Sequence, residues 1–151
     1  MKATLFIHKD HEKVQELFRK LDETQPNPRN GKHAVLAELK RELLAHSNVE
    51  VELFYPELLK TVSSRAQELV DEAIEDHRKI DRMVSEVAAM DSSDKSFDSK
   101  LTELIEFVNQ HIEKEEEDVF AEIRQYLSEQ RIEELGLELE ARKRILTQIA
   151  A

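Results

Sequence analysis

Two sets of residues in this chain have the types and spacing of metal ligands. Both sets follow one order, a lone histidine and then a His-x-x-x-Glu pair: His11, His46 and Glu50, and His77, His111 and Glu115. The two histidines of a set lie 35 residues apart in the first and 34 in the second, so the second set copies the first with an offset of 65 or 66. On a helix, residues four apart share a face and lie about 6 Å apart along the axis, so each pair directs an imidazole and a carboxylate into the same space. Two such pairs predict a site for two metal ions.

The candidate ligands lie on the apolar faces of predicted helices. His11 follows Ile7 by four residues and precedes Val14 by three, and His46 and Glu50 take positions where leucine would be expected. Buried glutamates on opposing helices repel each other or take up protons. Two cations held by four imidazoles and two carboxylates would neutralise them, and these nitrogen and oxygen donors suit iron, with manganese and zinc as alternatives.

A single histidine on an apolar face is more often a hydrogen-bonded core residue than a ligand. Here four histidines lie on four separate predicted helices in a repeated order, and two of them have a glutamate four residues later. This pattern favours the metal site. The remaining histidines differ: His33 lies beside a predicted loop and His8 lies at the edge of an apolar stripe. We expect both at the surface.

Three residues are candidates for a further ligand. Asp81 lies four residues after His77, and Tyr55 lies five residues after Glu50, which is off the stripe of an α-helix. His8 is the third. The acidic run at 113–118 is expected to be a solvated face apart from Glu115.

Four amphipathic helices are needed to position these residues. Apolar side chains recur at intervals of three and four over about residues 5–21, 33–53, 64–87 and 101–119. Turn-forming residues at 25–31 and 91–96 predict loops, Pro56 is expected to kink or end the second helix, and Ser64 is expected to cap the third. The pattern predicts an all-α fold, an antiparallel up-down four-helix bundle over residues 1–127.

A C-terminal helical extension is predicted over residues 128–151. Ser128 is expected to cap a short helix that ends at Gly136. A last helix then packs on the outside of the bundle through Leu139, Leu146 and Ile149. The basic run 142–144 is expected to be solvated.

Composition narrows the functional classes. The 151 residues fit one domain, and 2 glycines, 3 prolines and 36% charged residues favour long helices. A net charge of −11 disfavours nucleic acid and anionic membranes as partners. The chain has no cysteine, which excludes thiolate ligands, and no apolar stretch long enough for a membrane span, so we expect a cytoplasmic protein.

These residues resemble the hemerythrin family, specifically the bacterial HHE cation-binding domains. The matching motifs are Asp10-His11, His46-x-x-x-Glu50 with Glu52-Leu-Phe-Tyr-Pro56, His77, and His111-x-x-x-Glu115-Glu116 with Val119-Phe120, within about residues 3–126. The resemblance implies a carboxylate-bridged pair of irons. Its terminal ligands would be His11, His46, His77 and His111, and its bridges Glu50 and Glu115.

One departure from the family is informative. Oxygen-carrying hemerythrins have two histidines four apart on the third helix, but Ala73 and Asp81 flank His77 at that spacing. The resemblance therefore implies a more open centre, with positions left on each iron for water, a further protein ligand, dioxygen, peroxide or nitric oxide. This favours a protein that binds such small ligands in oxygen, nitric oxide or iron handling.

Three other functions remain open. The same site could belong to a redox enzyme that consumes peroxide or oxidises ferrous iron, so the sequence leaves the question of enzymatic activity undecided. The chain could also be a metal-responsive interaction module whose C-terminal helix contacts a partner. A structural bundle with inert histidines is the third alternative.

Overall fold

Every regular element of the protein is helical in the computed structural model, which describes residues 1–24 and 31–150. The elements are α1 (Ala3–Thr24), α2 (Lys32–Val49), η1 (Glu50–Phe54), α3 (Tyr55–Leu59), α4 (Ser64–Ala89), α5 (Phe97–Lys114), η2 (Glu115–Val119), α6 (Phe120–Tyr126) and α7 (Glu129–Ala150). The all-α class is confirmed. The loop predicted at 25–31 lies, apart from Gly31, outside the described residues. Among the described helices, none has both the length and the apolar character to cross a membrane.

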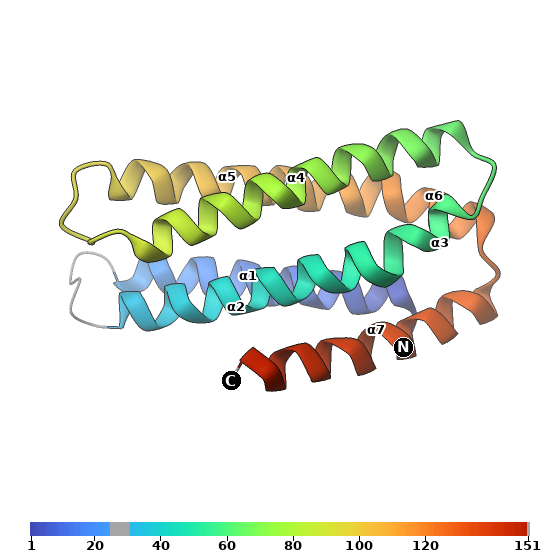
Figure 1. Ribbon diagram of the computed structural model, residues 1–151, viewed down its shortest axis with the longest axis horizontal. Helices are drawn as coiled ribbons and strands as arrows, with labels where there is room; N and C mark the ends of the chain where they lie inside the picture. The colour runs from blue at the N-terminus through green and yellow to red at the C-terminus, as the bar shows by residue number, and fades with distance from the viewer. Residues whose placement is uncertain (25–30, 151) are drawn as a thin grey trace.

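Four long helical segments lie side by side along the longest axis (Figure 1). They are α1, α2 with η1 and α3, α4, and α5 with η2 and α6. Contacts join α1 to α2, α2 to α4, and α4 to α5. The last helix, α7, runs back along α1 and α2, so it covers one side of the molecule.

The buried apolar side chains form two clusters with a polar layer between them. His11 lies on α1 between Ile7, which belongs to the first cluster, and Val14, which belongs to the second. His77 has a similar place on α4, four residues after Ala73 of the first cluster. Each core therefore closes one end of the space that the candidate ligands share.

A π-helical turn follows each His-x-x-x-Glu pair. It begins at Glu50 in η1 and at Glu115 in η2. The backbone N–H of Tyr55 bonds to the carbonyl of Glu50, and that of Phe120 to the carbonyl of Glu115, both five residues back. Pro56 was predicted to kink or end the second helix, and the helical backbone does not end there, because Pro56 lies within α3. Proline does not cause the π-turn either, since η2 has none.

The cap of α4 lies one residue earlier than predicted. Ser63, not Ser64, has extended backbone angles, and its hydroxyl accepts a hydrogen bond from the N–H of Ala66 at 3.1 Å. The same type of cap begins α7, where the Ser128 hydroxyl accepts from the N–H of Arg131 at 3.1 Å, as the sequence predicted.

The prediction of a helix end at Gly136 is wrong, because α7 runs unbroken through it. A Cβ atom at this position would lie 1.8 Å from the carbonyl oxygen of Met1 and 2.9 Å from the backbone nitrogen of Ala3. The glycine therefore permits close packing of α7 on the start of α1, a tertiary requirement that a sequence pattern does not distinguish from a helix stop.

Apolar and charged contacts both hold α7. Leu135 and Leu139 are fully buried in the first core cluster, and Leu146 packs against it, while the side chain of Ile149 lies outside the described residues. Arg131 donates to both carboxylate oxygens of Glu57, at 2.6 and 3.2 Å.

The prediction of a solvated basic run at 142–144 is wrong for Lys143. Arg142 donates to Glu52 at 2.8 Å, and the side chain of Lys143 is only 13% exposed. Their helix lies against α2 and η1, so both cations contact carboxylates, while 38% of the Arg142 side chain stays exposed.

Candidate metal centre

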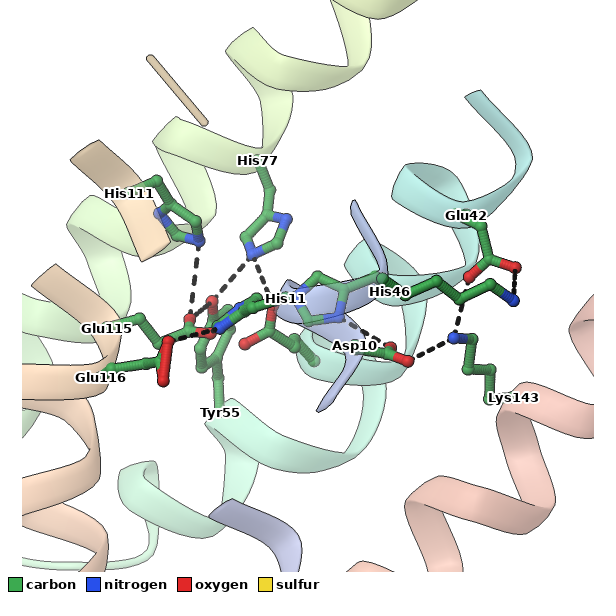
Figure 2. A network of polar contacts seen from close by, with 12 residues as sticks. Asp10, His11, Glu42, His46, Tyr55, His77, His111, Glu115, Glu116 and Lys143 are labelled. Atoms are coloured by element: carbon green, nitrogen blue, oxygen red, sulfur yellow. Dashed lines mark hydrogen bonds and ion pairs between the residues drawn. The ribbon is translucent and has the colours of Figure 1, made fainter. Parts of the chain in front are cut away.

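The structure brings all six predicted ligands together in the polar layer, none of them more than 6% exposed. Their donor atoms form two groups, each with all atoms within 4.8 Å of one another: His11, His46, Glu50 and Glu115, and Glu50, His77, His111 and Glu115. Figure 2 shows the four histidines and Glu115 converging on one space. Both glutamates belong to both groups, which is the arrangement that two ions sharing carboxylates require.

Glu115 connects the two halves of the bundle. One of its carboxylate oxygens lies 3.2 Å from Nε2 of His11 on α1, and the other lies 3.6 Å from Nε2 of His111 on its own helix. A carboxylate with one oxygen near each histidine has the geometry of a bridge.

Glu50 makes the corresponding contacts from the first half. Its Oε1 lies 3.2 Å from Nε2 of His77 on α4 and next to Nε2 of His46 on its own helix. Each glutamate thus approaches one histidine from each half, and the Nε2 atoms all point inward.

Several of the inward atoms are buried and form no hydrogen bond of ordinary geometry, although ion-pair contacts within the cluster reach some of them. Those of the candidate ligands are Nε2 of His11, His46 and His111, both oxygens of Glu50 and Oε1 of Glu115. Buried polar atoms rarely lack partners, and lone pairs of imidazole and carboxylate are what a cation binds. The residues present therefore fit a pair of metal ions.

The outward nitrogens of three histidines donate to carboxylates. Nδ1 of His46 donates to Asp10 at 3.0 Å, and Nδ1 of His111 donates to Asp76 at 3.1 Å. A hydrogen bond at Nδ1 fixes the ring orientation and leaves the Nε2 lone pair free for a metal. These roles of Asp10 and Asp76 were not predicted from the sequence. A signal existed, because each aspartate precedes the lone histidine of its half, at offset 66.

Glu116 is the third such acceptor, and it corrects the prediction of a solvated acidic run. Its side chain is 25% exposed, and one oxygen accepts from Nδ1 of His11 at 3.2 Å. The other oxygen bonds to His8, whose side chain is 47% exposed. His8 therefore lies near the surface as expected, but Glu116 connects it to the centre.

Tyr55 faces the centre, contrary to the prediction that it lies off the stripe. Its hydroxyl lies 2.8 Å from Nε2 of His77 and donates to Glu115. The π-turn explains this, because a residue five positions on lies about one turn further along when the hydrogen bond spans five residues. Asp81, the other candidate, has one buried oxygen without a hydrogen bond but belongs to neither donor group.

Charge pairing in the cluster determines where protons lie in the metal-free protein. Burial alone lowers the pKa of His46, but the charge of Glu50 and the hydrogen bond to Asp10 outweigh it and hold the pKa well above its usual value. Burial alone raises the pKa of Glu50, but His46 and other contacts outweigh it and hold the pKa well below its usual value. The pair is therefore ionic without metal, and a bound cation must displace the proton.

The sequence profile of the family described as Hemerythrin HHE cation binding domain matches residues 3–123, which include every candidate ligand. A crystal structure of a hemerythrin HHE cation-binding domain-containing protein from Mycobacterium kansasii superimposes with a TM-score of 0.84 and 25% sequence identity, over 98% of this chain and 88% of that one.

The chain is also similar to a curated protein named DNA nickase from Nostoc sp. (strain PCC 7120 / SAG 25.82 / UTEX 2576). The two are 30% identical over 138 residues, which is 91% of this chain. The match spans only 38% of the length of that relative.

Proposed function

Because the chain belongs to the hemerythrin HHE cation-binding domain family, as its sequence motifs indicated, we propose that its buried cluster holds two iron ions. The observation that carries this proposal is the pair of donor groups that share Glu50 and Glu115. One ion would be held by His11 and His46, the other by His77 and His111, with both glutamates between them. When bound, a pair of irons supplies electron transfer and open positions for a small ligand.

The proposed ligands are dioxygen, peroxide or nitric oxide, and a cavity beside the histidines supports this size class. It has a volume of about 10 Å³, room for about one water-sized molecule. The four histidines line it together with apolar side chains, but neither glutamate does: its other residues are Val14, Leu43, Ile80, Val108 and Ile112. A pocket of this volume favours a ligand about the size of a water molecule and excludes metabolites.

Tyr55 is proposed to supply a further oxygen donor on the side of His77, where the second histidine of oxygen-carrying hemerythrins is missing. Its hydroxyl is fully buried and contacts both His77 and Glu115. Burial and the nearby charges of Glu115 and Glu50 raise the pKa of this phenol well above its usual value. The phenol is therefore neutral in the metal-free protein, and a bound cation would favour its deprotonation.

Metal content tests the proposal directly. We expect elemental analysis of the full chain, purified from iron-supplemented cells, to give about two irons per chain. A folded chain with little or no bound metal would contradict the di-iron centre and favour the interaction or structural functions. Absorption spectra with dioxygen, peroxide and nitric oxide then identify the ligand, and rapid consumption of peroxide would instead indicate an enzyme.

Two broader predictions belong to the same proposal. Residues 1–127 would form the metal-binding bundle and residues 128–151 an extension, which agrees with the packing of α7 on α1 and α2. The protein would act in the cytoplasm without a nucleic-acid partner, and the net charge of −11 supports the absence of such a partner. Titration with labelled DNA tests this, and tight binding would contradict it.

A further inference from the structure

A lysine of the C-terminal helix α7 contacts the aspartate that hydrogen-bonds to the candidate ligand His46. Lys143 on α7 bonds through Nζ to one oxygen of Asp10, and the other oxygen of Asp10 accepts from Nδ1 of His46 at 3.0 Å. Lys143 also lies 2.9 Å from Glu42 on α2. Figure 2 shows Lys143 reaching between the two carboxylates.

All three side chains of this contact are shielded from water. The exposed fractions are 13% for Lys143, 8% for Asp10 and 10% for Glu42. Two carboxylates so close and so buried would repel each other without a cation, and one would turn away or take up a proton. Among the described residues, Lys13 pairs with Glu42 alone, at 2.8 Å, so Lys143 is the lysine that pairs with Asp10.

The other half of the bundle lacks this arrangement. Asp76 accepts from His111 at 3.1 Å, as Asp10 does from His46, but its side chain is 21% exposed. Within the part of the chain that the structure describes, no lysine or arginine forms an ion pair with Asp76. The position that corresponds to Glu42, 65 residues further on, is Phe107.

We propose that Lys143 is a positioning residue, which holds Asp10 against His46 and thereby makes the two metal positions inequivalent. The inference rests on the proposed function. A carboxylate fixed at Nδ1 keeps the imidazole in the tautomer and orientation that present Nε2 to the metal.

The size of the effect follows from metal sites in general. Loss of a residue that hydrogen-bonds a ligand lowers metal affinity about 10- to 100-fold. Lys143 does not contact the ligand itself but acts through Asp10, so we expect its loss to weaken metal binding about tenfold, the lower end of this range. The weakening should be confined to the ion held by His11 and His46, because Asp76 orients His111 at the other ion.

The test compares Lys143→Met with Arg142→Met in the full iron-loaded chain. Arg142 is the neighbouring cation on α7, and it pairs with Glu52 rather than with Asp10. An Fe²⁺ chelator with reductant releases the iron, and absorbance follows the release. We expect Lys143→Met to release one of its two irons about tenfold faster than the unmodified chain and the other at the original rate. Arg142→Met should release both at the original rates.

Further measurements separate positioning from general loss of structure. Lys143→Arg, which keeps the charge, should restore most of the slow release, and Lys143→Gln provides a second uncharged variant if the methionine variant unfolds. The Mössbauer spectrum of Lys143→Met should show a change in only one of two iron signals. No change, equal acceleration of both irons, or the same effect in Arg142→Met would each overturn the proposal.

Failure of the proposed function has a different signature. An unmodified chain that binds no iron would refute the di-iron centre itself, before any comparison of variants. An unmodified chain with about two irons and unchanged release in the Lys143 variants would leave the centre in place and refute only the role of Lys143.

Discussion

The two halves of the bundle carry the same donors in different surroundings. The first half consists of α1, α2, η1 and α3, and the second half consists of α4, α5, η2 and α6. Each half supplies an Asp-His pair, a His-x-x-x-Glu pair and a π-turn directly after the glutamate. The aspartate of each half binds the second histidine of that same half. Two ions that share two carboxylates, as proposed, would need equivalent donors from both sides.

The surroundings differ at corresponding positions. Tyr55 in the first half corresponds to Phe120 in the second, and Glu116 in the second corresponds to Val51 in the first. Among the described residues, the most extensive contacts of α7 are with α1, α2 and η1, which all belong to the first half. A repeated set of ligands can therefore hold two ions whose chemical environments are unequal. Variants at corresponding positions test which residues of the two halves are equivalent.

The largest effect is expected at the glutamates, which should be equivalent. Glu50→Ala and Glu115→Ala should each lose most of the iron, because each carboxylate belongs to both donor groups. His46→Ala and His111→Ala should each lower iron to about one ion per chain. Elemental analysis measures this, with His33→Ala, at an exposed position, as the unchanged control. Unaltered iron content in Glu115→Ala would show that this residue is not a bridge.

Tyr55 should distinguish the halves. Tyr55→Phe removes a buried hydroxyl that contacts His77 and donates to Glu115, so the metal-free protein should lose about 1–3 kcal/mol of unfolding free energy. Urea unfolding measures this. Tyr126→Phe, at a tyrosine that is 44% exposed, should change stability by less than about 0.5 kcal/mol. In the iron-loaded protein, Tyr55→Phe should also change the visible absorption spectrum, and an identical spectrum would exclude Tyr55 as a ligand.

Gly136 tests how closely α7 must approach the first half. Gly136→Ala should destabilise the protein by about 1–3 kcal/mol, because the new methyl group meets the carbonyl of Met1. At an exposed helical position the same change would stabilise by up to about 1 kcal/mol. The reverse change Ala141→Gly, at an exposed position of α7, calibrates this helix propensity. A more stable Gly136→Ala variant would contradict the close packing.

The smallest effect is expected in the pH dependence of stability that Glu57 contributes. Glu57 accepts hydrogen bonds from Arg131 of α7. Hydrogen bonds from Arg131 are the main cause that lowers the pKa of Glu57, and they outweigh its burial. Since the folded pKa lies below the unfolded value of about 4.3, the stabilisation is complete above that pH and is lost as pH falls through the folded pKa. The ion pair is partly exposed and should contribute less than about 1 kcal/mol.

Urea unfolding at about pH 6 and about pH 3 checks this prediction. The loss of stability between the two should be smaller in Glu57→Gln than in the unmodified chain. Glu122 is the corresponding residue of the second half and accepts from the neutral hydroxyl of Ser63 at 3.2 Å. Glu122→Gln should therefore alter the pH dependence less, and an equal change in both variants would argue against a specific role of the Arg131 contact.

Local periodicity in the sequence was sufficient to predict the helices and which residues share an inward face. The steps of three and four around His11 and His77 placed both histidines inward, and they are buried. The spacing of His111 and Glu115 likewise predicted a pair on one face. Such predictions succeed because the geometry of a single helix fixes them, whatever packs against it.

Only the tertiary structure decided the contacts between different helices and the positions of residues at the two π-turns. Tyr55 faces the centre because a π-turn changes the residue step, and no pattern at η1 or η2 signals that turn. Lys143 reaches Asp10 across 133 residues of sequence. A basic run at the end of a helix is ordinarily solvated, but Lys143 is shielded from water here because α7 folds back along α1 and α2. The sequence by itself determined which donors exist and which way each helix presents them, since those are local properties. Packing decided which charges and hydroxyls surround the donors, since that depends on which helices meet.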